Sequence, residues 1–150
     1  MTDLPLWIAG SAVWLYWLGV LVMVLKQRLA GRGSGFVPRQ GPERWMWLVW
    51  APVIGLWIAL PILGLTQDDR PWALPAWSQS GVWHVVRWIA AIDGVGCLAF
   101  TIVCWVKMGR SWAMANVPGE DAELVTVGPF KWVRHPIYAL SIMLMIDTWI

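Results

Sequence analysis

Residues 6–25 read LWIAGSAVWLYWLGVLVMVL, twenty residues without a charged side chain. As an α-helix with a rise of about 1.5 Å per residue, this run is about 30 Å long, which matches the hydrocarbon core of a bilayer. Backbone N–H and C=O groups find no water in lipid, so an apolar run crosses a membrane as a helix that satisfies its own hydrogen bonds. The run therefore predicts a membrane-spanning helix.

Three more apolar runs follow along the chain. Residues 46–65 and 82–106 predict a second and a third spanning helix, and residues 137–150 predict the beginning of a fourth. The second run contains Pro52 and Pro61, which kink a membrane helix more often than they end it. We therefore predict an all-α integral membrane protein, a single domain with three transmembrane helices and the start of a fourth.

The fourth run is short for a membrane crossing. Its 14 residues make a helix of about 21 Å, against a hydrocarbon core of roughly 30 Å. A chain that ended there would leave a carboxylate and unpaired carbonyls in lipid, at a cost of several kcal/mol each. Either this segment is re-entrant or a C-terminal part is missing, and we expect the second.

The composition agrees with a membrane protein. Hydrophobic residues make up 59% and charged residues 13% of the 150 residues, against roughly 45–50% and about 25% in soluble domains. Fifteen tryptophans suit the headgroup interface, where indole rings are favoured. A net charge of +2 gives no sign of nucleic-acid binding, and two cysteines exclude a disulfide scaffold. The expected partner is the lipid bilayer.

Basic residues in the predicted loops indicate the orientation. Those of the first loop are Lys26, Arg28, Arg32, Arg39 and Arg44, and those of the third are Lys107, Arg110, Lys131 and Arg134. The second loop, residues 66–81, holds a single one, Arg70. Because short cytoplasmic loops carry an excess of Lys and Arg, we predict an inner-membrane protein with loops one and three in the cytoplasm and the N-terminus outside.

Most of the polar groups that could support chemistry lie in the third loop and at the start of the fourth helix. Gly128-Pro129 is a turn signal. Pro136 suits the first turn of a helix, where its missing N–H costs nothing. His135 and Tyr138 are three residues apart and so share one face of that turn. We therefore place a candidate site at this point.

From the residues alone, each of these groups also fits a structural role. His135 can hydrogen-bond at the interface, Tyr138 can belong to an aromatic belt, and Arg134 can be a basic anchor beside a helix end. The acidic patch Glu120, Asp121 and Glu123 is better interpreted as a solvated loop face than as an acid–base pair.

The third apolar run carries an acidic residue near its middle. Asp93 is costly there, so it is either functional, or protonated, or bonded to a neighbouring helix. Asp147 also lies within a predicted membrane segment, and its role depends on where the chain ends. Cys97 and Cys104 are best explained as apolar filler. No histidine cluster accompanies these two cysteines, so we predict no metal site.

One contiguous motif resembles a known family. GPF at residues 128–130 followed by VRHPIY at residues 133–138 resembles the Gly-Pro-Tyr/Phe and Val-Arg-His-Pro-x-Tyr signature of the isoprenylcysteine carboxyl methyltransferase and phospholipid methyltransferase superfamily. Residues 109–112 and 124–126 are also similar to that family, and the resemblance covers about residues 108–145. The first three helices resemble it only in being apolar and similarly placed.

The resemblance implies a membrane methyltransferase that takes its methyl group from S-adenosylmethionine, without a metal. The acceptor would be lipid-like or prenylated, with carboxyl O-methylation favoured. The alternatives are a phospholipid N-methyltransferase and a non-catalytic scaffold or transport subunit. By carry-over, Arg134 lies near the substrate or cofactor carboxylate as the catalytic group. The residues expected to bind the cofactor are His135 and Tyr138, with Leu124, Val125, Gly128 and Phe130 as weaker candidates.

The chain departs from the family pattern at two points. Leu140 stands two residues after the motif tyrosine, where the family usually has glycine. The family also has a later helix and a Glu-Glu segment that complete the cofactor pocket, and these have no counterpart before Ile150. We therefore expect the pocket to be incomplete in these 150 residues, which puts their activity on their own in doubt.

Overall fold

The computed structural model describes residues 4–32, 41–65, 80–113 and 125–150. These residues form helices and contain no strand, which confirms the all-α prediction. The acidic patch at residues 120–123, the candidate Leu124 and most of the second predicted loop lie outside the described residues.

Three helices are long and apolar enough to span a bilayer, as predicted. Their bounds are α1 (Leu4–Leu29), α2 (Gly41–Leu65) and α3 (Gly81–Met108). Each extends a few residues beyond its apolar run, because the helical hydrogen bonds continue into the more polar flanks. A shorter apolar helix, α4 (Pro136–Asp147), corresponds to the fourth run. The chain is therefore a multi-pass membrane protein.

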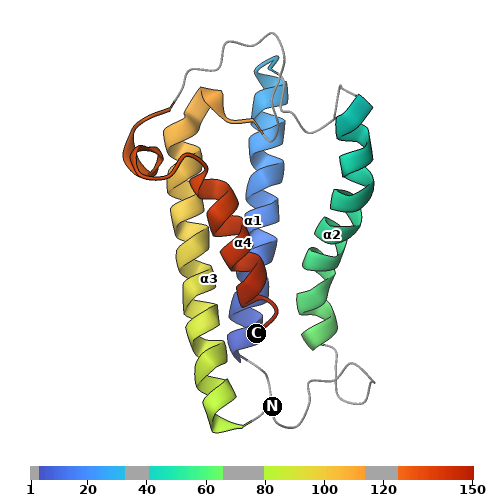
Figure 1. Ribbon diagram of the computed structural model, residues 1–150, viewed down its shortest axis with the longest axis vertical. Helices are drawn as coiled ribbons and strands as arrows, with labels where there is room; N and C mark the ends of the chain where they lie inside the picture. Colours follow the sequence, from blue (N-terminus) through green and yellow to red (C-terminus); the bar gives the residue numbers. More distant parts are fainter. Residues whose placement is uncertain (1–3, 33–40, 66–79, 114–124) are drawn as a thin grey trace.

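The helices pack as a bundle around α1. Helix α3 lies against α1, α4 lies against α3 and also contacts α1, and α2 packs on the other side of α1 (Figure 1). The C-terminal ends of α1 and α3 and the N-terminal end of α2 lie at one end of the bundle (Figure 1). Two short 3-10 helices lie near this end, η2 (Gly109–Ser111) and η3 (Gly128–Lys131).

Small residues allow the helices of the bundle to approach one another closely. A Cβ atom at Gly10 would lie 2.7 Å from the Cβ of Pro61 in α2, and one at Gly19 would collide with the ring of Trp105 in α3. Such positions are typical of membrane helix interfaces, where backbones come near enough for extensive van der Waals contact. Pro61 and Pro52 lie inside α2, which continues past both of them, as the sequence predicted.

The far end of α4 is fixed by a buried threonine. Thr148 Oγ1 donates to the carbonyl of Leu144 at 2.6 Å and accepts a hydrogen bond from Nε1 of Trp57 at 3.4 Å. Leu144 itself is fully buried in the core. A single hydroxyl therefore satisfies one of the last carbonyls of α4 and joins that helix to α2.

Candidate functional site

The segment before α4 is a tight turn built on a glycine. Gly128 has φ +64°, a left-handed backbone conformation that residues other than glycine rarely adopt. The N–H groups of Trp132 and Val133 both donate to the carbonyl of Pro129 at 3.1 Å and close the turn. The aliphatic stem of Lys107 lies 3.7–3.9 Å from where a Cβ of Gly128 would be. The turn is thereby packed against the end of α3.

Helix α4 begins immediately after this turn. His135 is the N-cap residue, with φ −130° and ψ 62°, and Pro136 occupies the first turn of the helix. Proline is favoured there because the missing N–H has no partner in the helix in any case. The predicted helix start is therefore confirmed, and it places the motif histidine at the junction of turn and helix.

His135 and Tyr138 lie in contact. Their ring centroids are 5.7 Å apart with an interplanar angle of 42°, as their spacing on one helix face predicts. Both side chains are exposed, Tyr138 with 60% of its surface. Two adjacent aromatic rings at the end of the bundle are thus open to a ligand.

A polar connection leads from Tyr138 into the bundle. Ser141 Oγ donates to the backbone carbonyl of Tyr138 at 2.9 Å, and the Ser141 side chain also lies near Tyr16 of α1. Tyr16 packs among tryptophan rings, with centroids 5.5 Å from Trp57 and 5.6 Å from Trp105. The sequence analysis missed Tyr16 and Ser141. The spacing of Ser141 from Tyr138 was the available signal, because residues three apart share a helix face.

Another residue that the sequence analysis missed, Gln27, connects α1 to the end of α3. Gln27 is 4% exposed, and its Nε2 donates to the carbonyls of Arg110 at 3.2 Å and Trp112 at 2.8 Å. Trp112 is also 4% exposed and belongs to the hydrophobic core. The amide of Gln27 thus fixes the start of the loop that leads to the motif.

The other predicted site residues lie around the turn. Val125 and Phe130 are half-buried, and Gly128 and Arg134 are exposed. The structure brings His135 and Tyr138 together and packs Gly128 on Lys107. The cofactor and catalytic roles of all these residues stay predictions.

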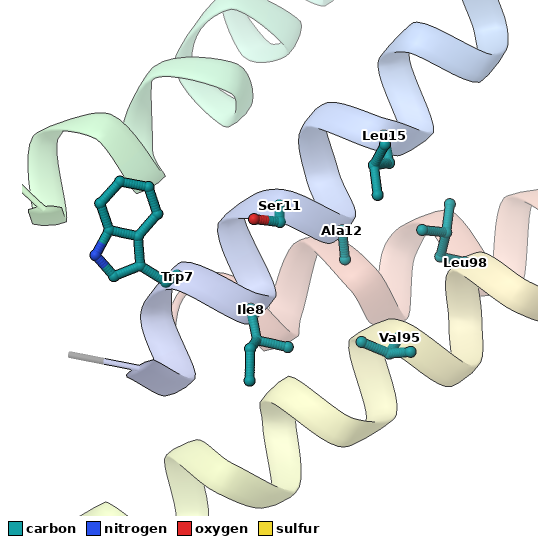
Figure 2. Close-up of a pocket in the computed structure, with 7 residues that line it drawn as sticks. All are labelled: Trp7, Ile8, Ser11, Ala12, Leu15, Val95 and Leu98. Atoms are coloured by element: carbon teal, nitrogen blue, oxygen red, sulfur yellow. The ribbon is translucent and has the colours of Figure 1, made fainter. Parts of the chain in front are cut away.

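An apolar pocket lies in the bundle, apart from the motif. It has a volume of about 280 Å³ and lies between α1 and α3, where Val95 and Leu98 face the N-terminal half of α1 (Figure 2). Its lining is Trp7, Ile8, Ser11, Ala12, Leu15, Val95 and Leu98. Because the lining is almost entirely apolar, the pocket suits a hydrocarbon chain better than a charged nucleoside.

A polar cluster lies where α3 and α4 pack together. Asp93 and Cys97 of α3 and Asp147 of α4 bring one oxygen or sulfur atom each within 4.8 Å of one another. The sequence analysis predicted no metal site because it looked for histidines near the cysteines. It missed this group, since Asp147 is more than fifty residues from Asp93 along the chain.

Comparison with known proteins finds a family match in the part of the chain that contains the motif at residues 128–138. Residues 93–150 match the isoprenylcysteine carboxyl methyltransferase (ICMT) family. The match confirms the resemblance drawn from the motif, and it includes the second half of α3. It supports a membrane methyltransferase kind of function. No solved structure matches the chain.

One curated relative is similar to a longer part of the chain. It is the nickel-cobalt-cadmium resistance protein NccN of Alcaligenes xylosoxydans xylosoxydans, 29% identical over 94 residues. The similarity covers 62% of this chain and 36% of NccN. The chain therefore spans about a third of the length of the curated relative it matches. The ICMT match covers residues 93–150 of this chain.

Proposed function

We propose that the chain is the membrane portion of a methyltransferase that transfers a methyl group from S-adenosylmethionine to the carboxylate of a lipid-like or prenylated acceptor. The observation that carries this proposal is the ICMT match over residues 93–150. The contact between His135 and Tyr138 at the start of α4 supports it, because both rings are open to a ligand.

The residues around the turn fit a zwitterionic cofactor. S-adenosylmethionine supplies, when bound, an activated methyl group on a sulfonium sulfur. His135 and Tyr138 offer aromatic faces and polar edges, and Tyr138 can donate through its hydroxyl. Arg134, which precedes His135 in the chain, and Lys131 in η3 are exposed cations that can pair with a carboxylate. Gly128 keeps the backbone free of a Cβ where the turn is tightest.

The reaction asks little of the protein beyond positioning. A carboxylate acceptor is ionised at neutral pH, so it attacks without a general base. Holding acceptor and methyl carbon in line and excluding water can contribute several kcal/mol. Arg134 is the candidate to orient the acceptor carboxylate. An amphiphilic acceptor reaches the site from the bilayer, because the turn packs against Lys107 at the end of the membrane-spanning α3. In the proposed orientation, the end of the bundle with the turn lies on the cytoplasmic side of the inner membrane.

The alternative acceptors differ in their chemistry. A phospholipid amine must lose a proton before it attacks a methyl group, so N-methylation needs a base that carboxyl methylation does not. A scaffold or transport subunit that retains the motif would bind no cofactor. Cofactor binding therefore separates the enzymes from the scaffold, and the pH profile separates the two enzymes.

The proposal is tested on the full-length protein in lipid nanodiscs. We expect it to bind S-adenosylmethionine in calorimetry and to methylate a farnesylcysteine acceptor. His135→Ala should weaken cofactor binding tenfold or more, which corresponds to roughly 1.4 kcal/mol. The matched control is His84→Ala, because His84 also contacts an aromatic ring, that of Trp88 at 6.4 Å. Equal binding by wild type and His135→Ala would refute the role of His135, and no binding by wild type would refute the methyltransferase.

A second candidate function is a part in resistance to nickel, cobalt or cadmium. The observation that favours it is the similarity to NccN over 94 residues. We expect a host strain that lacks the gene to grow more poorly on salts of one of these metals, and the wild-type gene to restore growth. Growth that does not change with the gene would refute this candidate and leave the methyltransferase proposal untouched.

A further inference from the structure

The cluster of Asp93, Cys97 and Asp147 is formed by two helices that approach closely. Asp93 and Cys97 are four residues apart on α3, so they share one face of that helix. Asp147 reaches them from α4 opposite Gly94, where a Cβ would lie 3.7 Å from its Oδ2 atom. The carboxyl group of Asp147 therefore lies in close range of the α3 backbone at Gly94.

The polar atoms of the cluster have few partners besides one another. Cys97 is 3% exposed, and its Sγ lies 3.7 Å from Oδ2 of Asp93. Oδ2 of Asp147 is sealed from solvent and has no hydrogen-bond partner among the described residues. A buried oxygen without a partner costs free energy comparable to a lost hydrogen bond. Within a membrane, unpaired polar groups are more costly still, and a further group bound between the three side chains would remove this cost.

The donor atoms indicate which group that is. The carboxylate oxygens of Asp93 and Asp147 lie within 4.8 Å of each other. They repel each other when both groups are ionised, and a cation between them removes the repulsion. A thiolate beside carboxylates selects a divalent ion of intermediate or soft character over Mg²⁺ or Ca²⁺, which prefer oxygen alone. Three protein ligands leave one position of a tetrahedral ion for an outside ligand.

We propose that Asp93, Cys97 and Asp147 bind a divalent transition-metal ion such as Zn²⁺ or Co²⁺. Binding requires the Cys97 thiol to release its proton to solvent. Asp93 is exposed on the surface of the bundle, so its carboxylate is the outermost of the three ligands. The site is independent of the proposed methyl transfer, since Asp147 lies about 18 Å along α4 from His135 at the standard helical rise.

The test uses the full-length, untagged protein, stripped of metal in detergent micelles, with Co²⁺ alone as the probe. We expect one Co²⁺ per chain, with the near-ultraviolet absorption of a cobalt–thiolate bond and displacement by Zn²⁺. Cys97→Ala should lose this absorption. Cys104→Ala is the matched control, because Cys104 is also buried on α3 and lies outside the cluster. It should behave as wild type.

The carboxylates are tested by Asp147→Asn, which preserves the size of the side chain. We expect it to weaken Co²⁺ binding at least tenfold while the protein keeps its helical circular dichroism and its elution volume. This variant also decides the case in which Cys97→Ala fails to fold. Absence of the thiolate band in wild type, its loss in Cys104→Ala, or unchanged affinity in Asp147→Asn would overturn the proposal.

Discussion

Replacement of Gln27 by Met measures how strongly α1 holds the start of the third loop. Methionine keeps nearly the same volume and burial but removes the amide that donates to the carbonyls of Arg110 and Trp112. The change therefore isolates the two hydrogen bonds from the packing of the side chain. It also acts in α1, outside the residues that match the ICMT family.

The expected loss follows from the surroundings of each carbonyl. The carbonyl of Trp112 accepts its hydrogen bond in a buried setting, whereas that of Arg110 is only partly buried and can turn to water. A buried acceptor left without a donor costs about 1–3 kcal/mol, and an exchangeable bond contributes about 1 kcal/mol or less. We therefore expect the Gln27→Met variant to lose about 2 kcal/mol, or roughly a 30-fold change in an equilibrium constant.

Two measurements check this value. The free energy of unfolding in mixed detergent micelles should fall by about 2 kcal/mol, and trypsin should cleave after the exposed Arg110 faster, since cleavage follows the population of the open loop. Lys26→Met is the matched control, because Lys26 is exposed and is the neighbouring residue on α1. If the two variants unfold and cleave alike, the amide of Gln27 does not hold the loop and the reasoning fails.

Two glycine substitutions give further expectations. Gly19→Ala should cost about 1–3 kcal/mol of unfolding free energy, because the new Cβ collides with the Trp105 ring. Gly96→Ala, whose Cβ would meet nothing within 4 Å, should be close to neutral in the same assay, and equal effects would contradict the interface. Gly128→Ala places a side chain at φ +64°, at about 1–2 kcal/mol, and should weaken binding of S-adenosylmethionine about tenfold in calorimetry. Gly81→Ala, which has open space around it, should bind as wild type; unchanged binding by Gly128→Ala would show that the turn is not needed.

Long apolar runs were enough to predict the helices, because length and hydropathy alone define a membrane span. The start of α4 could also be predicted, since Pro136 and the spacing of His135 and Tyr138 are local features. The roles of these residues in cofactor binding, and the orientation derived from the loop charges, stay predictions.

The contacts between helices could not be predicted in the same way. The spanning helices are apolar all round, so their sequences do not show which face meets which neighbour. The hydrogen bond between Gln27 and Trp112 joins residues 85 positions apart. The meeting of Asp93 with Asp147 depends in the same way on how α3 and α4 pack.

The bond between Trp57 and Thr148 has a consequence for the accuracy of the distant motif. The bond holds the C-terminal end of α4 at Thr148, and the turn at Gly128 precedes its N-terminal end, so both ends of the helix are held in place. Over a length of about 18 Å, a tilt of only a few degrees at Thr148 displaces His135 by about an ångström. A misplacement of that size can cost a catalytic site about a hundredfold in rate. The buried hydroxyl of Thr148 therefore determines how precisely the exposed rings of His135 and Tyr138 are positioned.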